Sequence, residues 1–183
     1  MFAAALELAS AGCTLLQYRN KRGNARHMLD EARELRARLE ARVKLIMNDR
    51  ADLCIAAQYD GLHIGQDDLM AESARGMIGP DRRLGISTHN PEQISDADQT
   101  SADYLAIGPI FATRSKANPD PVLGLAGVRR ARELTRKPLV AIGGITRANA
   151  RSVIDAGADA VSVISDLLLD PLKSAEEFFG VLG

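Results

Sequence analysis

Seven short apolar segments recur along the chain, separated by longer stretches in which apolar and polar residues follow a helical period. Several of these segments are almost entirely hydrophobic, such as Leu-Val-Ala-Ile at 139–142, and do not alternate between apolar and polar residues. A continuous apolar run of this length is typical of a parallel strand that is buried on both faces. We therefore predict seven strands, at residues 14–19, 43–48, 60–64, 83–87, 103–108, 138–142 and 160–165.

The intervening segments have the pattern of amphipathic helices, most clearly at residues 25–42. Apolar side chains recur there every three to four residues and form one stripe, made of Leu29, Ala32, Leu35 and Leu39. Glu34 and Arg38 are four residues apart on the opposite face, where they can pair. The first twelve residues are also apolar, but Glu7 interrupts them and no basic segment precedes them. We predict an amphipathic helix there and not a signal sequence.

The starts of the predicted strands resemble one another. Each fits a tight turn from a helix into a strand: Ala-Gly-Cys at 11–13, Tyr-Asp-Gly at 59–61, Ala-Asp-Tyr at 102–104 and Ala-Asp-Ala at 158–160. Gly12 and Gly157 stand where a helix ends, a position at which a positive φ angle costs glycine little. These repeated turns indicate alternating strands and helices around a parallel sheet.

The distribution of glycine and polar residues favours a closed barrel over an open sheet. The chain contains neither G-x-G-x-x-G after its first strand nor G-x-x-x-x-G-K-[ST] anywhere, so no nucleotide-binding fingerprint supports an open sheet. Polar and glycine residues gather instead after the carboxyl ends of nearly every strand, where a TIM (β/α)8-type barrel builds its site. Such barrels often hold a phosphate after the last two strands, here at 142–144 and 162–165. The length predicts a single barrel domain, residues 1–183.

Composition narrows the classes of partner. The 23 basic and 24 acidic residues give a net charge of -1, so no overall positive field attracts nucleic acid or an anionic membrane. Aromatic residues are 4% and Trp is absent, which leaves few surfaces for stacking bases or sugars. Cys13 and Cys54 are far apart and indicate neither a disulfide framework nor a zinc site. No apolar run approaches the ~20 residues of a membrane span, and we expect a soluble, cytoplasmic protein.

The segment after the first strand carries three side chains suited to an anion. In an extended chain, Gln17, Arg19 and Lys21 point the same way because side chains alternate between the two faces. Arg can bind a diphosphate with its planar fork, and Lys binds as a point charge. A polar strand end wetted by solvent is the alternative reading.

Carboxylates follow the next two strands. Asp49 ends one of them and Asp67 and Asp68 follow the other, so the side chains should meet at one end of a parallel sheet. Mg²⁺ typically takes one or two protein carboxylates together with water and substrate phosphate. Asp49 with Asp68 is the predicted metal pair. The alternative is that Asp67 or Asp68 caps the helix that follows.

Hydroxyl and cationic side chains follow two further strands. Ser87 could donate to a phosphate oxygen, and His89 is expected to pack near the following helix or to cap it. Thr113, Ser115 and Lys116 lie in the longest connection of the chain, which suits a lid that excludes water from a substrate. A plain surface loop is the alternative.

These motifs, in this order, resemble the thiamine-phosphate synthase family, also called thiamine-phosphate pyrophosphorylase, from about Ala11 to Ser165. The resemblance is carried by QYRNK, NDR, GLHIGQDDL, LGIST, GPIFATRSK, IGGI and SVIS. It implies contacts with a pyrimidine diphosphate from Gln17, Arg19, Lys21, Asn48, Ser87 and Lys116. It implies Mg²⁺ ligands at Asp49 and Asp68. It also implies a thiazole phosphate site made of Thr113, Ser115, Gly144, Ile164 and Ser165, although the family commonly has Thr where Ser115 stands.

The resemblance further implies a reaction without a protein nucleophile. In this family the diphosphate leaves the methylene carbon of the pyrimidine, and the thiazole nitrogen captures the resulting carbocation. The protein must then stabilise negative charge on the leaving group. The expected catalytic residues are Arg19, Lys21, Ser87 and Lys116.

Two other functions share this fold. The related thiazole tautomerases use a histidine as base where this chain has Pro109, and Pro cannot transfer protons. They also tend to lose the metal carboxylates, which are present here as Asp49 and Asp68. A non-catalytic phosphate-binding barrel is the third possibility.

The chain departs from the family at its start. Family members begin with a further strand, an apolar run ending in Thr-Asp, and here residue 1 lies directly at the first helix. We expect a barrel that lacks its first strand, with the predicted strands at 14–19 and 160–165 as unpaired edges, and interpret the chain as truncated or mis-started. The C-terminal helix, with Phe178, Phe179 and Leu182, should dock on the barrel, although it could instead serve a partner subunit in a homo-oligomer.

Overall fold

The computed structural model describes residues 1–40, 42–113 and 120–183, and it contains one parallel sheet covered by helices. The seven strands lie in the order of the sequence: β1 (Leu15–Tyr18), β2 (Lys44–Asn48), β3 (Gly61–Ile64), β4 (Arg83–Thr88), β5 (Tyr104–Ile107), β6 (Leu139–Ile142) and β7 (Ala160–Ser162). All seven predicted strands are thereby confirmed. Because each strand pairs only with its neighbours in sequence, β1 and β7 form the two edges of the sheet.

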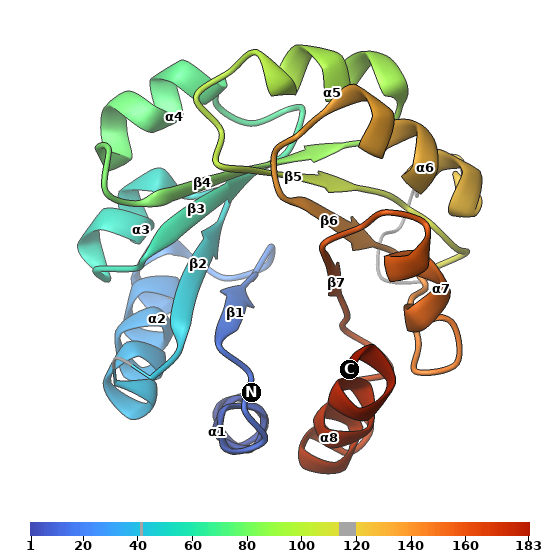
Figure 1. Cartoon of the computed structure of the whole chain (residues 1–183). Coiled ribbons are helices and arrows are strands. Elements are labelled where there is room, and N and C mark those ends of the chain that lie inside the picture. The colour runs from blue at the N-terminus through green and yellow to red at the C-terminus, as the bar shows by residue number, and fades with distance from the viewer. Residues whose placement is uncertain (41, 114–119) are drawn as a thin grey trace.

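Helices follow or precede every strand and lie outside the curved sheet (Figure 1). They are α1 (Phe2–Ser10), α2 (Ala25–Leu39), α3 (Ala51–Ala56), α4 (Ala71–Ile78), α5 (Pro91–Asp98), α6 (Gly124–Leu134), α7 (Ala150–Asp155) and α8 (Pro171–Leu182). The described elements therefore form a barrel-like fold with seven strands, which confirms the prediction of a (β/α)8-type barrel that lacks the first strand. In Figure 1 the strands curl into an incomplete ring that is open between β1 and β7.

Strand residues alternate between the helices and the interior of the curled sheet. In β2, Leu45 and Met47 belong to the large apolar core beneath the helices, whereas Ile46 is buried but lies outside that core cluster. The same alternation places Asn48 on the interior side. The core therefore fixes which strand residues are available to a site inside the ring.

Helix α2 shows how local sequence sets the boundaries of a helix. Asn24 caps its first turn, because the side-chain oxygen accepts a hydrogen bond from the backbone N–H of His27. Its predicted apolar stripe is largely right, but Met28 is fully buried where Leu29 is only partly so. The helix ends at Leu39, before the predicted residue 42, because Glu40 turns into a positive φ of 52°.

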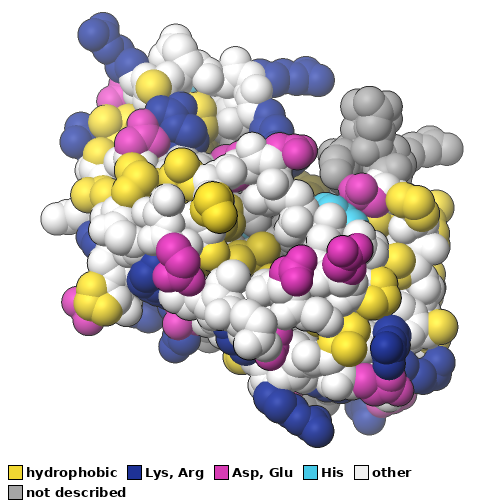
Figure 2. Space-filling model, turned by 90° about the horizontal axis from the view of Figure 1, so that it is seen from above, with side chains coloured by type: hydrophobic (Ala, Val, Ile, Leu, Met, Phe, Trp, Pro, Cys, Tyr) yellow, Lys and Arg dark blue, Asp and Glu magenta, His cyan; other side chains and the backbone are white. Residues whose placement is uncertain are grey.

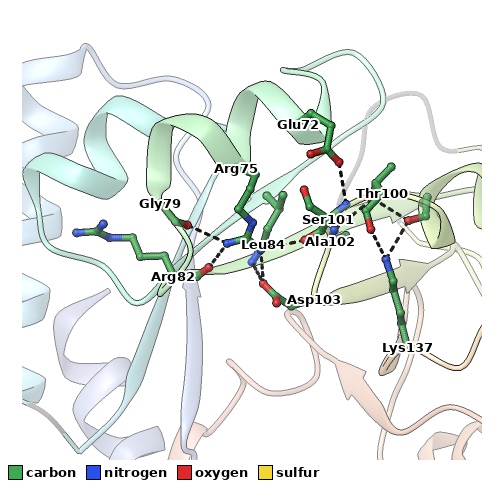
Figure 3. A network of polar contacts seen from close by, with 11 residues as sticks. Glu72, Arg75, Gly79, Arg82, Leu84, Thr100, Ser101, Ala102, Asp103 and Lys137 are labelled. Atoms are coloured by element: carbon green, nitrogen blue, oxygen red, sulfur yellow. Dashed lines mark hydrogen bonds and ion pairs between the residues drawn. The ribbon is translucent and has the colours of Figure 1, made fainter.

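Acidic residues fasten the entries of alternate strands. The carboxylates of Asp60, Asp103 and Asp159 accept the backbone N–H of a leucine at the start of β2, β4 and β6, respectively. Each also pairs with an arginine of the helix before that strand, which is α2, α4 or α6. Figure 3 shows the second of these units, in which Arg75 binds Asp103 at 2.6 Å and also the carbonyl groups of Gly79 and Arg82. This repeat is the structural counterpart of the similar strand entries in the sequence.

Helix α8 lies against both α7 and α1. Phe178 is 5% exposed, so the predicted docking of the C-terminal helix is confirmed. The first and last helices are thus neighbours even though β1 and β7 are not paired. At the end of α1, Gly12 has the predicted positive φ, at 102°, and so has Gly157 after α7, at 113°.

The surface carries charges of both signs. On the face seen in Figure 2, acidic and basic side chains are interspersed, and hydrophobic side chains form several small groups. None of the helices in the described ranges combines the length and the apolar character needed to cross a membrane.

Candidate active site

Three of the predicted site residues point into the interior of the curled sheet from its carboxyl end. Gln17, Asn48 and Ser87 follow the strand positions of Leu15, Ile46 and Gly85 at a spacing of two. Their neighbours Tyr18, Met47 and Ile86 pack instead in the core beneath the helices. The alternation predicted from the sequence therefore brings polar side chains from β1, β2 and β4 to the carboxyl end of the inner face of the sheet.

The loop after β1 is braced from outside the sheet. Tyr18 donates a hydrogen bond to the Glu31 carboxylate at 2.5 Å, and Asn20 Nδ2 donates to the same oxygen at 3.2 Å. Asn20 also accepts from the backbone N–H groups of residues 22 and 23, which fixes the turn. Tyr18 and Asn20 are thus tied to α2, and the intervening Arg19 and the following Lys21 stay exposed.

Lys21 and Asp49 link the ends of β1 and β2. Lys21 Nζ lies 3.3 Å from Asp49 Oδ2, and the Asp49 side chain is 23% exposed. Asp49 has a φ of 63°, in the left-handed region that few residues other than glycine, Asn and Asp adopt. A strained backbone at a strand end often marks a functional residue, because the surrounding structure must stabilise it.

Asp49 also lies close to Asp68. Burial, and next the neighbouring Asp68 carboxylate, raise the pKa of Asp49 above its ordinary value, while Lys21 opposes this shift. Two carboxylates this close disfavour each other's ionisation unless a cation lies between or beside them. The pair predicted from the sequence is therefore brought together.

The carboxylate pair fits a magnesium ion better than a transition metal. Within the described residues, no group of three or more His, Cys, Asp or Glu side chains is placed to hold a metal ion. Two hard oxygen donors at the strand ends match the incomplete protein shell that Mg²⁺ accepts. The donor set is thus consistent with the predicted ion, because the two carboxylates lie next to each other at the strand ends.

The alternative role of Asp67 and Asp68 as helix caps is wrong. Helix α4 begins after Met70, whose side chain makes no capping bond. Asp68 accepts the backbone N–H of Gly65 at 2.7 Å, so it closes the turn directly after β3. Gln66 reaches from this turn to the carbonyl of Ser87 at 2.6 Å and joins it to the end of β4.

Ser87 is held by His63, a residue to which the sequence assigned no role. His63 Nε2 lies 2.8 Å from Ser87 Oγ, and His63 Nδ1 lies 3.0 Å from the Tyr104 hydroxyl. Burial lowers the pKa of His63 to about 4, against a smaller contribution from Asp68. The imidazole is therefore neutral at neutral pH. A usable signal was the spacing of two in β3 and β4, which puts His63 and Ser87 on the same face.

The ends of β5 and β6 form a second part of the site. Phe111 donates its backbone N–H to the Gly143 carbonyl at 2.9 Å, so the segment after β5 runs along the end of β6. Gly144 has a φ of 63°, and a Cβ there would lie 2.5 Å from the Ala112 carbonyl oxygen. Only glycine fits this approach, which brings the predicted Gly144 close to the segment that contains Thr113.

The loop after β6 is also tied to the end of β7. Arg147 donates from its backbone N–H and from Nε to the Asp166 carboxylate, both at 3.0 Å, and its guanidinium also bonds Glu177 of α8. The predicted Ile164 and Ser165 directly precede Asp166 and are exposed. Gly144, Ile164 and Ser165 therefore belong to two connected loops at the same end of the sheet, whereas the predicted Ser115 and Lys116 lie outside the described residues.

His89 does not cap a helix. The N-cap of α5 is Asn90, and His89 Nδ1 lies 2.6 Å from the carbonyl of Gly108 and 3.5 Å from an oxygen of Asp120. The imidazole thus packs against the start of the connection after β5. No metal role is indicated by these contacts.

The chain is similar in sequence and in structure to proteins of one known family. The family model for thiamine monophosphate synthase matches residues 1–167. A thiamine-phosphate synthase from Koribacter versatilis (strain Ellin345) is 62% identical over 178 residues, which span 97% of this chain and 84% of that protein. A thiamine-phosphate synthase from Chloroflexus aurantiacus is 46% identical over 155 residues, 84% of this chain and 71% of that protein. A solved thiamine phosphate pyrophosphorylase from Pyrococcus furiosus has a TM-score of 0.89 and 33% identity, covering 99% of this chain and 88% of that one.

Proposed function

The chain belongs to the thiamine monophosphate synthase family, and we propose that it joins 4-amino-2-methyl-5-(diphosphooxymethyl)pyrimidine to thiazole phosphate. The products are thiamine phosphate and diphosphate. The observation that supports this reaction best is the meeting of Lys21 with the Asp49 and Asp68 pair at the barrel mouth. A cation and a metal-binding carboxylate pair suit a substrate whose leaving group carries several negative charges.

In the proposed reaction, the bond between the methylene carbon and the diphosphate oxygen breaks, and its electron pair leaves with the diphosphate. The electron-rich aminopyrimidine stabilises the carbocation, and the thiazole nitrogen then donates its electron pair to form the new C–N bond. Arg19 and Lys21 are exposed at the mouth and stabilise the negative charge as it grows on the leaving group. Each ~1.4 kcal/mol of such preferential stabilisation is about tenfold in rate.

Asp49 and Asp68 would hold Mg²⁺, which supplies charge neutralisation to the diphosphate when it is bound. Gln17 and Asn48 face the interior beside them and orient the pyrimidine diphosphate, and the Ser87 hydroxyl donates to it. Lys116 is assigned to the same diphosphate from the resemblance alone.

The thiazole phosphate takes the other part of the mouth in this proposal. Gly144 has no side chain, which lets the segment that carries Thr113 approach the loop after β6, so both are available to one phosphate. Ile164, Ser165 and, by resemblance, Ser115 complete this site. A phosphate at the ends of the last two strands agrees with the usual place of phosphates in barrels of this class.

A single assay tests the proposed function. The protein is incubated with both substrates and Mg²⁺, and thiamine phosphate and diphosphate are measured together. Equal amounts of the two products support the synthase. An isomerised thiazole phosphate without diphosphate would make the protein a tautomerase, and binding of phosphate without any product would make it a non-catalytic barrel.

A further inference from the structure

Three strands contribute to one part-buried chain of hydrogen bonds in the interior of the sheet. His63 of β3 lies between Ser87 of β4, at 2.8 Å, and the hydroxyl of Tyr104 of β5, at 3.0 Å. His63 is 7% exposed. A Cβ on Gly85 would lie 2.0 Å from Cζ of Tyr104, so the ring of Tyr104 occupies the space that Gly85 leaves empty. The arrangement is thus built into the packing of the interior.

The direction of these hydrogen bonds follows from the number of donors. A neutral imidazole has one N–H donor and one acceptor nitrogen. The ring nitrogens of His63 meet two hydroxyl groups and, among the described residues, no carboxylate within hydrogen-bond distance, and the side chain is 7% exposed. An unpaired buried charge is costly, so the imidazole is neutral and carries one proton, while the phenol of Tyr104 keeps its own. Among the described residues, His63 is the hydrogen-bond partner of the Tyr104 hydroxyl. If His63 Nδ1 carried the proton, the hydroxyl hydrogen of the part-buried Tyr104 would have no acceptor among the described residues, which is costly.

The favoured arrangement therefore runs in one direction. The Tyr104 hydroxyl donates to His63 Nδ1, the proton of His63 resides on Nε2, and Nε2–H donates to Ser87 Oγ. Ser87 then has its own hydrogen available for another acceptor. The side chain of Gln66 donates to the backbone carbonyl of Ser87 at 2.6 Å. Both the backbone and the hydroxyl of Ser87 are therefore held by hydrogen bonds.

We propose that His63 and Tyr104 are positioning residues, which orient the Ser87 hydroxyl as a hydrogen-bond donor to the pyrimidine diphosphate. This inference rests on the proposed function. A free serine hydroxyl rotates among several positions, whereas one that already accepts a hydrogen bond has fewer and is polarised as a donor. The ordered chain from Tyr104 through His63 thus prepares Ser87 before the substrate binds.

The tautomer of His63 can be measured without substrate. The ¹⁵N shifts of the imidazole of the free protein, assigned with a His63→Gln variant, report which nitrogen carries the proton. We expect the proton on Nε2, and a mixture of tautomers in Tyr104→Phe. A proton on Nδ1 in the wild-type protein would overturn the proposal whatever the enzyme catalyses.

A double-mutant cycle tests the effect on Ser87. Tyr104→Phe keeps the ring over Gly85 and removes only the hydroxyl, and we expect it to lower kcat/KM for the pyrimidine diphosphate about tenfold, as for one lost hydrogen bond. KM for thiazole phosphate should stay unchanged. In a Ser87→Ala background the same substitution should have no further effect, because its target is gone. Equal losses in both backgrounds would overturn the proposal.

Tyr59→Phe is the matched control for a lost buried hydroxyl. Tyr59 is 1% exposed and donates to the Ala32 carbonyl beneath α2, on the opposite side of the sheet. This variant should lose stability without losing kcat/KM.

His63→Gln, which keeps a donor and an acceptor, should retain more activity than His63→Leu. Absence of thiamine phosphate from the wild-type protein would instead reject the proposed function, while the tautomer measurement would still decide the hydrogen-bond direction.

Discussion

Asp49 combines an unfavourable backbone conformation with unfavourable electrostatic surroundings. Its φ is 63°, it is largely buried, and its carboxylate lies close to that of Asp68. Each of these properties destabilises the folded protein, and the Lys21 ammonium at 3.3 Å offsets the electrostatic part only partly. A site that is unfavourable by itself and improves on binding a cation is what a metal ligand requires.

Asp49→Asn should separate metal binding from folding. Asn adopts the left-handed region readily and carries no charge, so the protein should fold without added strain. Turnover should fall by roughly 10²-fold or more, since several kcal/mol of charge stabilisation are lost. Mg²⁺ should raise the unfolding temperature of the wild-type protein but not of Asp49→Asn or Asp68→Asn. Asp67→Asn is the neighbouring control and should keep the Mg²⁺ response. A response that also persists in Asp49→Asn and Asp68→Asn would contradict the metal assignment.

The raised pKa of Asp49 predicts a specific dependence of stability on pH. Between the ordinary pKa of 3.8 and the raised folded value, the folded protein binds more protons at Asp49 than the unfolded protein does. The contribution of this group to the free energy of unfolding therefore falls as pH rises through that window. In metal-free buffer, the stability difference between Asp49→Asn and the wild-type protein should grow over this pH range. Denaturant unfolding at several pH values measures it, and a constant difference would speak against the shift.

Glu31 is a second residue whose role depends on its partners. Its carboxylate accepts from Tyr18 and Asn20, which hold the loop that presents Arg19 and Lys21. Glu31→Gln should weaken both bonds and raise KM for the pyrimidine diphosphate about five- to tenfold, as expected for a loss of about 1 kcal/mol. Steady-state kinetics checks this, with the exposed Asp30→Asn as control. An unchanged KM would show that the loop keeps its shape without the brace.

At the scale of elements, the strands are joined at their entries by a repeated polar unit. Asp60, Asp103 and Asp159 each exchange two hydrogen bonds with a leucine of the neighbouring strand, one through the backbone and one through the carboxylate. In addition, each carboxylate pairs with an arginine of α2, α4 or α6, so these three helices are attached to the sheet. These units lie at the end of the strands opposite to the candidate site, and they separate the residues that stabilise the fold from those that bind ligands.

Asp103→Asn tests this separation. The variant keeps the shape of the side chain but weakens charge-assisted bonds to Arg75 and to the backbone of Leu84 (Figure 3). We expect the free energy of unfolding to fall by about 1–3 kcal/mol with kcat unchanged. Denaturant unfolding and initial rates measure the two quantities. The exposed Asp81→Asn should change neither, and a large loss of kcat in Asp103→Asn would contradict the separation.

At the scale of the whole molecule, the arrangement of helices compensates in part for the open sheet. Strands β1 and β7 are unpaired with each other, yet α8 packs on α1 as well as on α7. The interior positions near the opening are correspondingly exposed, with Leu15 at 51%. The apolar contacts of α8 therefore carry much of the connection between the two ends of the chain.

Two adjacent phenylalanines of α8 test this connection. Phe178 is 5% exposed and belongs to the main core, whereas Phe179 is 45% exposed. Phe178→Ala should lower the free energy of unfolding by about 3–5 kcal/mol, because it removes buried surface and leaves a cavity. Phe179→Ala should cost about 1 kcal/mol or less. Similar losses in the two variants, measured by denaturant unfolding, would show that α8 does not anchor through its buried face.

The sequence by itself determined the elements and the faces they present. Continuous apolar runs are local signals of buried strands, and a spacing of two decides that Gln17, Asn48 and Ser87 face the interior. The family motifs likewise identified the residues at the strand ends. These features could be predicted because periodicity, turn preference and motif order depend only on neighbours along the chain.

Only the tertiary structure decided which side chains meet. Asp68 is not a helix cap because its carboxylate folds back on Gly65 beside Asp49, and His63 gains a role because Ser87 and Tyr104 approach it from two other strands. The missing side chain of Gly85 gives Tyr104 its space, which no local pattern reveals. Such contacts depend on strand register, sheet curvature and burial together, so a spacing along the chain predicts a shared face but not a hydrogen-bond partner.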